Sequence, residues 1–173
     1  MSTLKVNSII PVAGVPTGGG GGIVQTVIGT HSTEVSQSIS SENTVQTTIT
    51  DTGLTASITP TSTSSKVLVM VHQHYGFDFT SDAKVEYNFV VRDSSNNILD
   101  GSIGTGSEGT QVYRSLKVWY DYYYTTFLHS PNTTSAFTYK VGMNLYRIDG
   151  GTPPMYAQRH GNESKIILME VSA

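Results

Sequence analysis

Apolar and polar residues alternate along much of this chain beyond residue 22, in short runs separated by turn-forming residues. The segment 136–146 shows the alternation most clearly: its odd positions are apolar and its even positions are mostly polar or glycine, with Phe137, Tyr139, Val141, Met143 and Leu145 on the apolar side. A period of two is typical of a β-strand that buries one face and exposes the other. We therefore predict a strand here with one face toward a core.

Similar segments recur at intervals of about ten residues, and no window carries a helical stripe of apolar residues. We predict strands over 23–28, 44–50, 54–59, 66–75, 84–92, 98–99, 111–124, 136–146 and 165–171. Residues 51–53 (Asp-Thr-Gly) predict a hairpin turn between two of them, and residues 93–97 predict another strand-connecting turn. This spacing favours an all-β fold, an antiparallel β-sandwich that is jelly-roll-like.

Two of the predicted strands are apolar on both faces. Val67, Val69 and Val71 share one face of the segment 66–75, whereas Leu68 and Met70 share the other, and residues 166–169 (Ile-Ile-Leu-Met) are apolar at consecutive positions. A two-layer sandwich buries one face of each strand, so the second apolar face needs another cover. A neighbouring copy of the chain is the simplest cover, and we expect a homotrimer.

The chain divides into three parts at its run of five glycines. Residues 1–17 form a strand-like arm, residues 18–22 form a tether, and residues 23–173 form the β-sandwich domain. Glycine loses more conformational freedom on ordering than any other residue, so such a run is a good connector. We predict an anchoring arm with apolar contacts from Leu4, Val6, Ile9, Ile10 and Val12, and a tether made of Gly18, Gly19, Gly20, Gly21 and Gly22.

Composition excludes several classes of function. The chain has no cysteine, its net charge is −3, and charged residues make up 13%, about half the usual share. Since no cluster of Lys and Arg is present, nucleic-acid binding is not expected. No apolar run is long enough for a membrane span, so membrane insertion is not expected either. We find no nucleophile motif, phosphate loop or cofactor motif, and therefore predict a protein that is not an enzyme and takes no cofactor.

His72 and His74 have the one spacing in the chain that suggests a metal site. On a strand, both imidazoles project from one face, and three such pairs around a trimer axis would offer six nitrogens to an octahedral metal ion. A pair alone is not a site, however, and burial at an interface explains it more simply. We therefore favour packing over metal binding.

An aromatic cluster at residues 119–124 (Trp-Tyr-Asp-Tyr-Tyr-Tyr) has two interpretations. Flat rings with nearby hydroxyls and a carboxylate are suited to glycan contact, which would involve Trp119, Tyr120, Tyr122 and Tyr123. Aromatic residues are also favoured in strands and at subunit interfaces. We favour packing and keep glycan contact open.

Three segments carry a resemblance to a known class of proteins: MSTLKVNSIIPVAGVPTGGGGGIVQ at the start, TDTGLTASITPTSTSSKVLVMV at residues 50–71, and ESKIILMEVSA at the end. Together they resemble small virion structural proteins of tailed bacteriophages, especially marine and cyanobacterial phages. The resemblance implies a location in the virion, an arm over residues 1–17 that contacts other virion proteins, and a β-domain that forms an outward trimeric knob.

We accordingly predict a virion fibre or knob subunit of the tail or head, with a role in assembly and in attachment to a host surface glycan. Two alternatives remain open at this point. One is a lectin-like carbohydrate-binding module, and the other is a capsid decoration protein.

Overall fold

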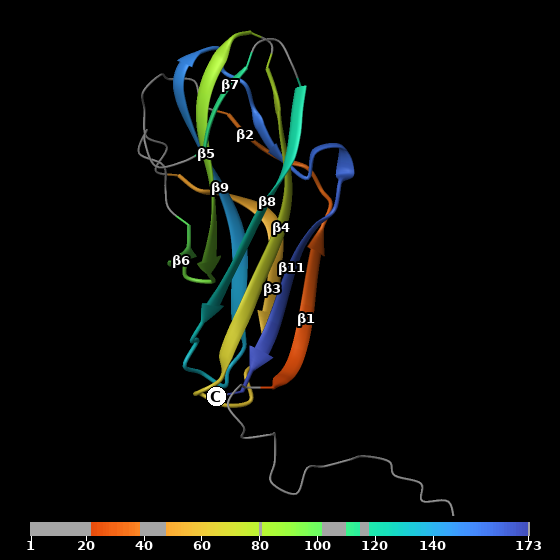
Figure 1. Cartoon of the computed structure of the whole chain (residues 1–173), viewed down its shortest axis with the longest axis vertical. Helices are drawn as coiled ribbons and strands as arrows, with labels where there is room; N and C mark the ends of the chain where they lie inside the picture. The colour runs from red at the N-terminus through yellow and green to blue at the C-terminus, as the bar shows by residue number, and fades with distance from the viewer. Residues whose placement is uncertain (1–21, 39–47, 80, 102–109, 115–117, 173) are drawn as a thin grey trace, which may run out of the picture.

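The computed structural model describes residues 22–38, 48–79, 81–101, 110–114 and 118–172, and the part it describes is built of β-strands (Figure 1). Within that part, the helical element is one short 3-10 turn, so no described helix has the length and apolarity needed to cross a membrane. The elements are β1 (Ile23–His31), β2 (Val35–Gln37), β3 (Thr50–Ile58), β4 (Lys66–Asp78), β5 (Ala83–Asp93), β6 (Ile98–Asp100), β7 (Thr110–Arg114), β8 (Val118–His129), β9 (Phe137–Gly150), β10 (Met155–Ala157), η1 (Arg159–Gly161) and β11 (Ser164–Val171).

The strands form two antiparallel sheets that pack face to face as a sandwich. One sheet has the order β1-β11-β4-β8, extended at one end by β10 and β2, and the other has the order β3-β9-β5 with β6 and β7 on the outer edge of β5. In Figure 1, β8, β4, β11 and β1 lie side by side in front of β9 and β3. The predicted all-β antiparallel sandwich is confirmed.

The strand pairing is that of a jelly roll. Counting the eight principal strands along the chain, the first pairs with the eighth, the second with the seventh, the third with the sixth and the fourth with the fifth: β1 with β11, β3 with β9, β4 with β8 and β5 with β7. This is a long antiparallel hairpin rolled up so that its paired arms fall alternately into the two sheets.

The predicted hairpin turn at residues 51–53 is wrong. Asp51 pairs with Gly142 and Thr55 with Lys140, so β3 continues through this point with extra residues bulged out of the pairing. Gly53 has a φ of 81°, a value that glycine adopts without the penalty of a side chain. Thr52 then fixes the bulge, because its Oγ1 donates to the carbonyl of Val141 at 3.0 Å. A bulge and a turn use the same residue types, which is why the sequence did not separate them.

A second correction concerns the predicted long strand over 111–124. It is two strands in different sheets, since β7 pairs with β5 and β8 pairs with β4. The turn predicted at residues 93–97 is present. Asp93 accepts hydrogen bonds from the backbone N–H groups of Ser95 and Asn97 at 2.8 and 2.9 Å and from the Asn97 side chain at 2.7 Å, which lowers the pKa of Asp93.

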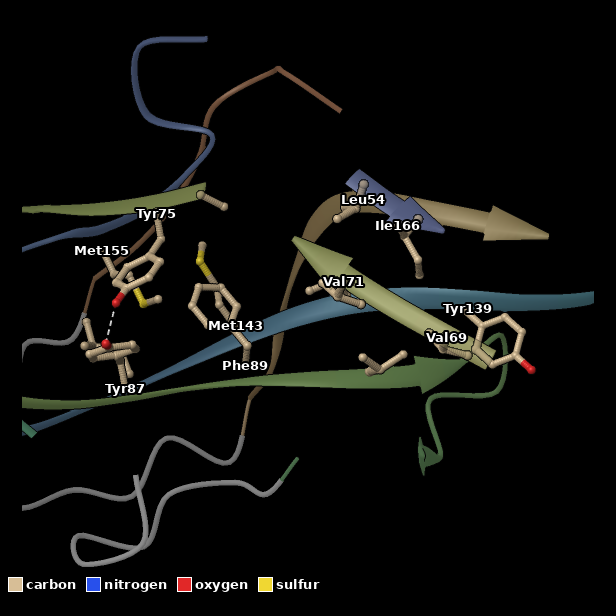
Figure 2. Close-up of a cluster of buried hydrophobic side chains, with 14 of the residues drawn as sticks. Leu54, Val69, Val71, Tyr75, Tyr87, Phe89, Tyr139, Met143, Met155 and Ile166 are labelled. Carbon is tan, nitrogen blue, oxygen red and sulfur yellow. Dashed lines mark hydrogen bonds between the residues drawn. The ribbon is translucent and has the colours of Figure 1, made fainter. Parts of the chain in front are cut away.

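The core lies between the sheets and is rich in aromatic rings (Figure 2). All five odd-numbered apolar residues predicted for the segment 136–146 belong to it or pack against it. Four of them are fully buried: Tyr139, Val141, Met143 and Leu145. The opposite face of β9 is less exposed than predicted, because Asn144 is buried and donates to the carbonyl of Thr48 at 3.4 Å.

A hydrogen bond between two buried tyrosines crosses this core from sheet to sheet. The hydroxyls of Tyr75 on β4 and Tyr87 on β5 bond to each other, as the dashed line in Figure 2 shows. Burial, and then the bond to Tyr87, raise the pKa of Tyr75 far above its usual value. The Tyr75 hydroxyl is therefore neutral under ordinary conditions.

We expect Tyr87→Phe to lower the free energy of unfolding by about 1–3 kcal/mol, because the buried Tyr75 hydroxyl loses its partner. Adding Tyr75→Phe should restore part of the loss, since the unpaired hydroxyl is then removed as well. A double-mutant cycle by urea denaturation measures both effects. A Tyr87→Phe protein as stable as the original would contradict a structural role for this bond.

The predicted arm and the glycines Gly18 to Gly21 lie outside the described residues. The described chain starts at Gly22, whose carbonyl accepts a hydrogen bond from the N–H of Ser172 at 3.1 Å. The sandwich therefore begins and ends at the same extremity, the lower one in Figure 1. The far ends of β4 and β8, where Asp78 pairs with Val118, lie at the other extremity, roughly 40 Å away at the usual rise per residue.

Candidate functional site

The outer face of the sheet β1-β11-β4-β8 is the surface of interest, and we call it the outer sheet face. Every second residue of each of the four strands points to this face, and the cross-strand register brings these residues side by side. Its members are Thr26, Ile28, Thr30, Lys66, Leu68, Met70, His72, His74, Asp78, Val118, Tyr120, Tyr122, Tyr124, Thr126, Leu128, Lys165, Ile167 and Met169. In the single chain many of them are open to solvent, and Tyr124 is 65% exposed.

Histidine and tyrosine rings interleave along this face. His72 lies opposite Tyr124 and His74 lies opposite Tyr122 in the pairing of β4 with β8. The ring centroid of His72 is 4.5 Å from those of both Tyr122 and Tyr124, and the centroid of His74 is 5.0 Å from that of Tyr122 and 6.2 Å from that of Tyr120. Directly opposed cross-strand pairs bring rings into this contact.

Gly76 makes room for the last tyrosine of the row. It lies opposite Tyr120, and a Cβ built on Gly76 would lie 2.5 Å from Cδ1 of that ring. The tyrosine hydroxyl then bonds to Nε2 of His160 at 2.7 Å. The row thus runs without interruption across β4 and β8 to η1, in the order Tyr124, His72, Tyr122, His74, Tyr120 and His160.

His160 was not anticipated from the sequence. It lies in η1 with a positive φ of 58°, two residues after Gln158 with a φ of 53°, and no periodic pattern marks such a turn. Arg159 holds the turn in place by ion pairs with Glu34, at 2.8 Å, and with Asp78. The Arg159 guanidinium also lies 3.8 Å from the ring centroid of Tyr156.

The imidazoles in the row are held in an apolar environment. Burial, then the nearby His160 and His72, lower the pKa of His74, so its neutral form is favoured at neutral pH. Nδ1 of His74 and Nε2 of His72 are buried without a hydrogen-bond partner in the described part of the molecule. His74 therefore acts here as a flat, uncharged ring.

A shallow hollow of about 260 Å³ lies beside this row. It is lined by Met70, Val71, His72, Tyr124, Thr126, Lys165 and Ile167. Tyr124 forms one wall of the hollow and is also the most exposed tyrosine of the face. A projecting ring therefore lies directly beside the hollow.

Of the four residues predicted for glycan contact, two lie on the outer sheet face and two point toward the core. Tyr120 and Tyr122 lie on the outer sheet face. Trp119 and Tyr123 turn the other way: the Trp119 ring stacks on Phe77 at 6.0 Å between centroids, and Tyr123 stacks on Phe89 at 4.9 Å. Trp119 is partly buried, packs against the core and does not form a platform with the outward tyrosines.

His72 and His74 do share one face, as their spacing predicted. Among the described residues, however, no group of three or more His, Cys, Asp or Glu side chains is arranged to hold a metal ion. The rings around the pair are tyrosines, which supply packing for the imidazoles.

The exposed part of the opposite sheet has a different character. On β3 the outward residues are polar, with Asp51, Thr55 and Ser57 exposed. Asp51 pairs there with Arg92, and its Oδ2 lies 3.7 Å from Nζ of Lys140. The two outer surfaces of the sandwich therefore differ in chemistry, and the apolar one is the outer sheet face.

Comparison with known proteins gives similarity at the level of structure. No protein-family model matches the chain, and no curated protein matches it significantly. Among solved structures, that of the infectious bursal disease virus Gt strain matches with a TM-score of 0.43 and 7% identity, over 100% of this chain and 42% of that one. The Gx strain of the same virus gives 0.43 and 7%, over 87% and 38% of the two chains.

The infectious bursal disease virus VP2 subviral particle matches with a TM-score of 0.39 and 8% identity, over 87% of this chain and 38% of that chain. This chain thus spans less than half the length of each of these viral chains. At such scores the similarity carries no functional argument, and the jelly-roll assignment rests on the strand pairing alone.

Proposed function

We propose that this chain is a structural subunit of a virus particle, an arm-anchored oligomeric fibre or knob on the tail or head of a tailed bacteriophage. The observation that carries the proposal is the outer sheet face, where four adjacent strands present a largely apolar and aromatic surface. Monomeric proteins rarely expose contiguous apolar surface on this scale, so a face of this kind belongs to a protein that works in an assembly.

The arm supports the same function through its sequence. Leu4, Val6, Ile9 and Ile10 are suited to strand pairing and apolar insertion into a neighbouring virion protein, and a run of glycines is a sequence suited to a connector. Because the described chain begins next to Ser172, an arm that leaves from there would direct the far end of the sandwich away from its anchor. Several copies on one particle would add avidity to any contact with a host surface.

The direct test is to locate the chain in the virion. Particles purified by density gradient should contain it at a fixed copy number by quantitative mass spectrometry, and an image reconstruction should place the sandwich on the outside of head or tail. A chain that is abundant in infected cells and absent from purified particles would overturn the proposal.

Deletion of residues 1–21 separates anchoring from folding. We expect the truncated protein to keep its β circular dichroism, because Gly22 and its bond to Ser172 remain, and to be lost from particles. A second variant keeps the full chain length and replaces Leu4, Val6, Ile9 and Ile10 with serine. It should also be lost from particles, because the apolar contacts of the arm are removed. Truncated protein that still joins particles would show that the anchor lies in the sandwich.

A second candidate function is glycan binding by a lectin-like module, which one observation favours. Tyr120, Tyr122 and Tyr124 form a row of accessible rings with hydroxyls on one open face. Binding to a glycan array that Tyr122→Ala abolishes, and that deletion of residues 1–21 leaves intact, would support it.

A further inference from the structure

We propose that the outer sheet face is the surface by which copies of this chain pack against one another. The occupant of the face is a second copy of the same chain. This inference deepens the proposed function and rests on it for the expected number of three copies; the contact itself is argued from the face.

Charge does not oppose such a contact. In the middle of the face, the charged side chain is Lys165, and its Nζ pairs with Oε1 of Glu163 at 3.0 Å. Lys66 and Asp78 lie on the same side at the two ends of β4, and Asp78 pairs with Arg159. The surrounding side chains are aliphatic, aromatic or hydroxyl-bearing, so copies can approach without bringing unpaired like charges together there. The exposed β3 side of the opposite sheet, with Asp51 and Lys140, has no comparable apolar area.

The exposed apolar area is in the range that an interface needs. Tyr120, Tyr122 and Tyr124 are 42%, 39% and 65% exposed, which amounts to roughly 300 Å² at about 200 Å² for each tyrosine side chain. Ile28, Val118 and Leu128 are each more than half exposed and extend the patch at its edges. Together they form much of the ~800 Å² that each partner buries in an interface of standard size.

The shape of the face provides both halves of a contact. Tyr124 projects into solvent, and the adjoining hollow of about 260 Å³ is lined mainly by apolar atoms of Met70, His72 and Ile167. Anchoring aromatic side chains in pockets of the partner dominate the binding energy of many interfaces. We assign the hollow to an anchoring side chain of the neighbouring copy.

The imidazoles suit a covered position. His74 is 4% exposed and its pKa is lowered, and the atoms Nε2 of His72 and Nδ1 of His74 are already buried without partners. Covering the face at neutral pH therefore requires no charged imidazole of His74 to be dehydrated. A neighbouring copy would also cover Leu68 and Met70, which form the second apolar face that the sequence indicates for β4.

The test uses the full chain and two kinds of variant. By light scattering at micromolar concentration, we expect an oligomer for the original protein and for Ser57→Glu, which places a charge on the exposed polar face of β3. Tyr124→Glu places the same charge on the outer sheet face and should weaken association about 30-fold or more, as expected for loss of an anchoring aromatic residue. Circular dichroism verifies that both variants keep their β-structure.

Labelling of single cysteines gives an independent measurement, because the natural chain has none. Leu128→Cys on the outer sheet face should react with a maleimide about tenfold more slowly than Ser57→Cys, and adding Tyr124→Glu should remove the difference. This measurement does not depend on a folded Tyr124→Glu protein. The labelling rates of Leu128→Cys and Ser57→Cys are compared in proteins that keep Tyr124 and therefore form the oligomer.

Three results would overturn the proposal. They are a monomeric original protein, an oligomer that Tyr124→Glu does not weaken, and rapid labelling of Leu128→Cys within the oligomer. A monomer that binds glycan through Tyr122 would assign the face to glycan instead. Each outcome is independent of the virion test, since a chain absent from particles that still forms this oligomer would contradict the proposed function only.

Discussion

Glu170→Leu should lower the free energy of unfolding by about 3 kcal/mol, because it leaves a set of converging donors without their acceptor. Glu170 is fully buried at the lower extremity of the sandwich. Its Oε1 accepts from the backbone N–H and the hydroxyl of Thr61, at 2.8 and 2.6 Å, and its Oε2 accepts from Nε2 of Gln25 at 2.6 Å. The carboxylate thereby ties β11 to β1 and to the connection between β3 and β4.

The same carboxylate gives the effect a distinct pH dependence. Burial by itself would raise its pKa, but the hydrogen bonds from Thr61, Gln25 and Ser65 outweigh burial and lower the pKa from 4.5 to about 2. The unfolded chain therefore binds a proton more readily than the folded chain between these values. The stabilisation is complete above pH 4.5 and is lost as the pH falls from 4.5 toward 2, by up to about 3 kcal/mol.

Urea denaturation of both proteins at several pH values measures the effect. The difference in stability between the original protein and Glu170→Leu should be largest above pH 5 and should narrow on acidification. Glu163→Leu is the matched control, because Glu163 is half-exposed and its surface ion pair with Lys165 contributes at most about 1 kcal/mol. A difference that stays constant from pH 6 to pH 3.5 would show that the carboxylate charge does not carry the effect.

The sequence predicted the fold class and strands such as β4, β5, β9 and β11 because both depend on local periodicity. Alternation along β9 identifies its buried residues directly, and regular spacing of strands favours a sandwich. The bulge at Gly53 could not be separated from a turn, because both need a residue that tolerates a positive φ. Only the register of Asp51 and Thr55 against β9 distinguishes them.

The candidate site shows a different limit. Alternation groups the residues of β8 into two sets, but both sets are aromatic, so periodicity does not say which set faces the core. Contacts across the sandwich decide this, because Tyr87 and Phe89 on β5 of the opposite sheet contact the rings of Trp119 and Tyr123 in the core. The contact of His160 with Tyr120 joins residues forty positions apart and has no local signal.

Trp119→Ala and Tyr122→Ala should therefore separate core packing from surface function. We expect Trp119→Ala to cost about 3 kcal/mol in the free energy of unfolding, since it leaves a cavity beside Tyr75 and Phe77. Tyr122→Ala should cost the fold less than about 1 kcal/mol, because its ring is 39% exposed and contacts the two histidines from outside.

Function should respond in the opposite order. Tyr122→Ala removes a ring from the outer sheet face and should weaken association of the copies, whereas folded Trp119→Ala keeps that face and should associate normally. Denaturation at a fixed, low protein concentration measures the first pair of effects, and light scattering of the folded proteins measures the second. If Trp119→Ala were as stable as the original protein and lost association, the indole would have to act at the surface, and the division of β8 into a core side and an interface side would be wrong.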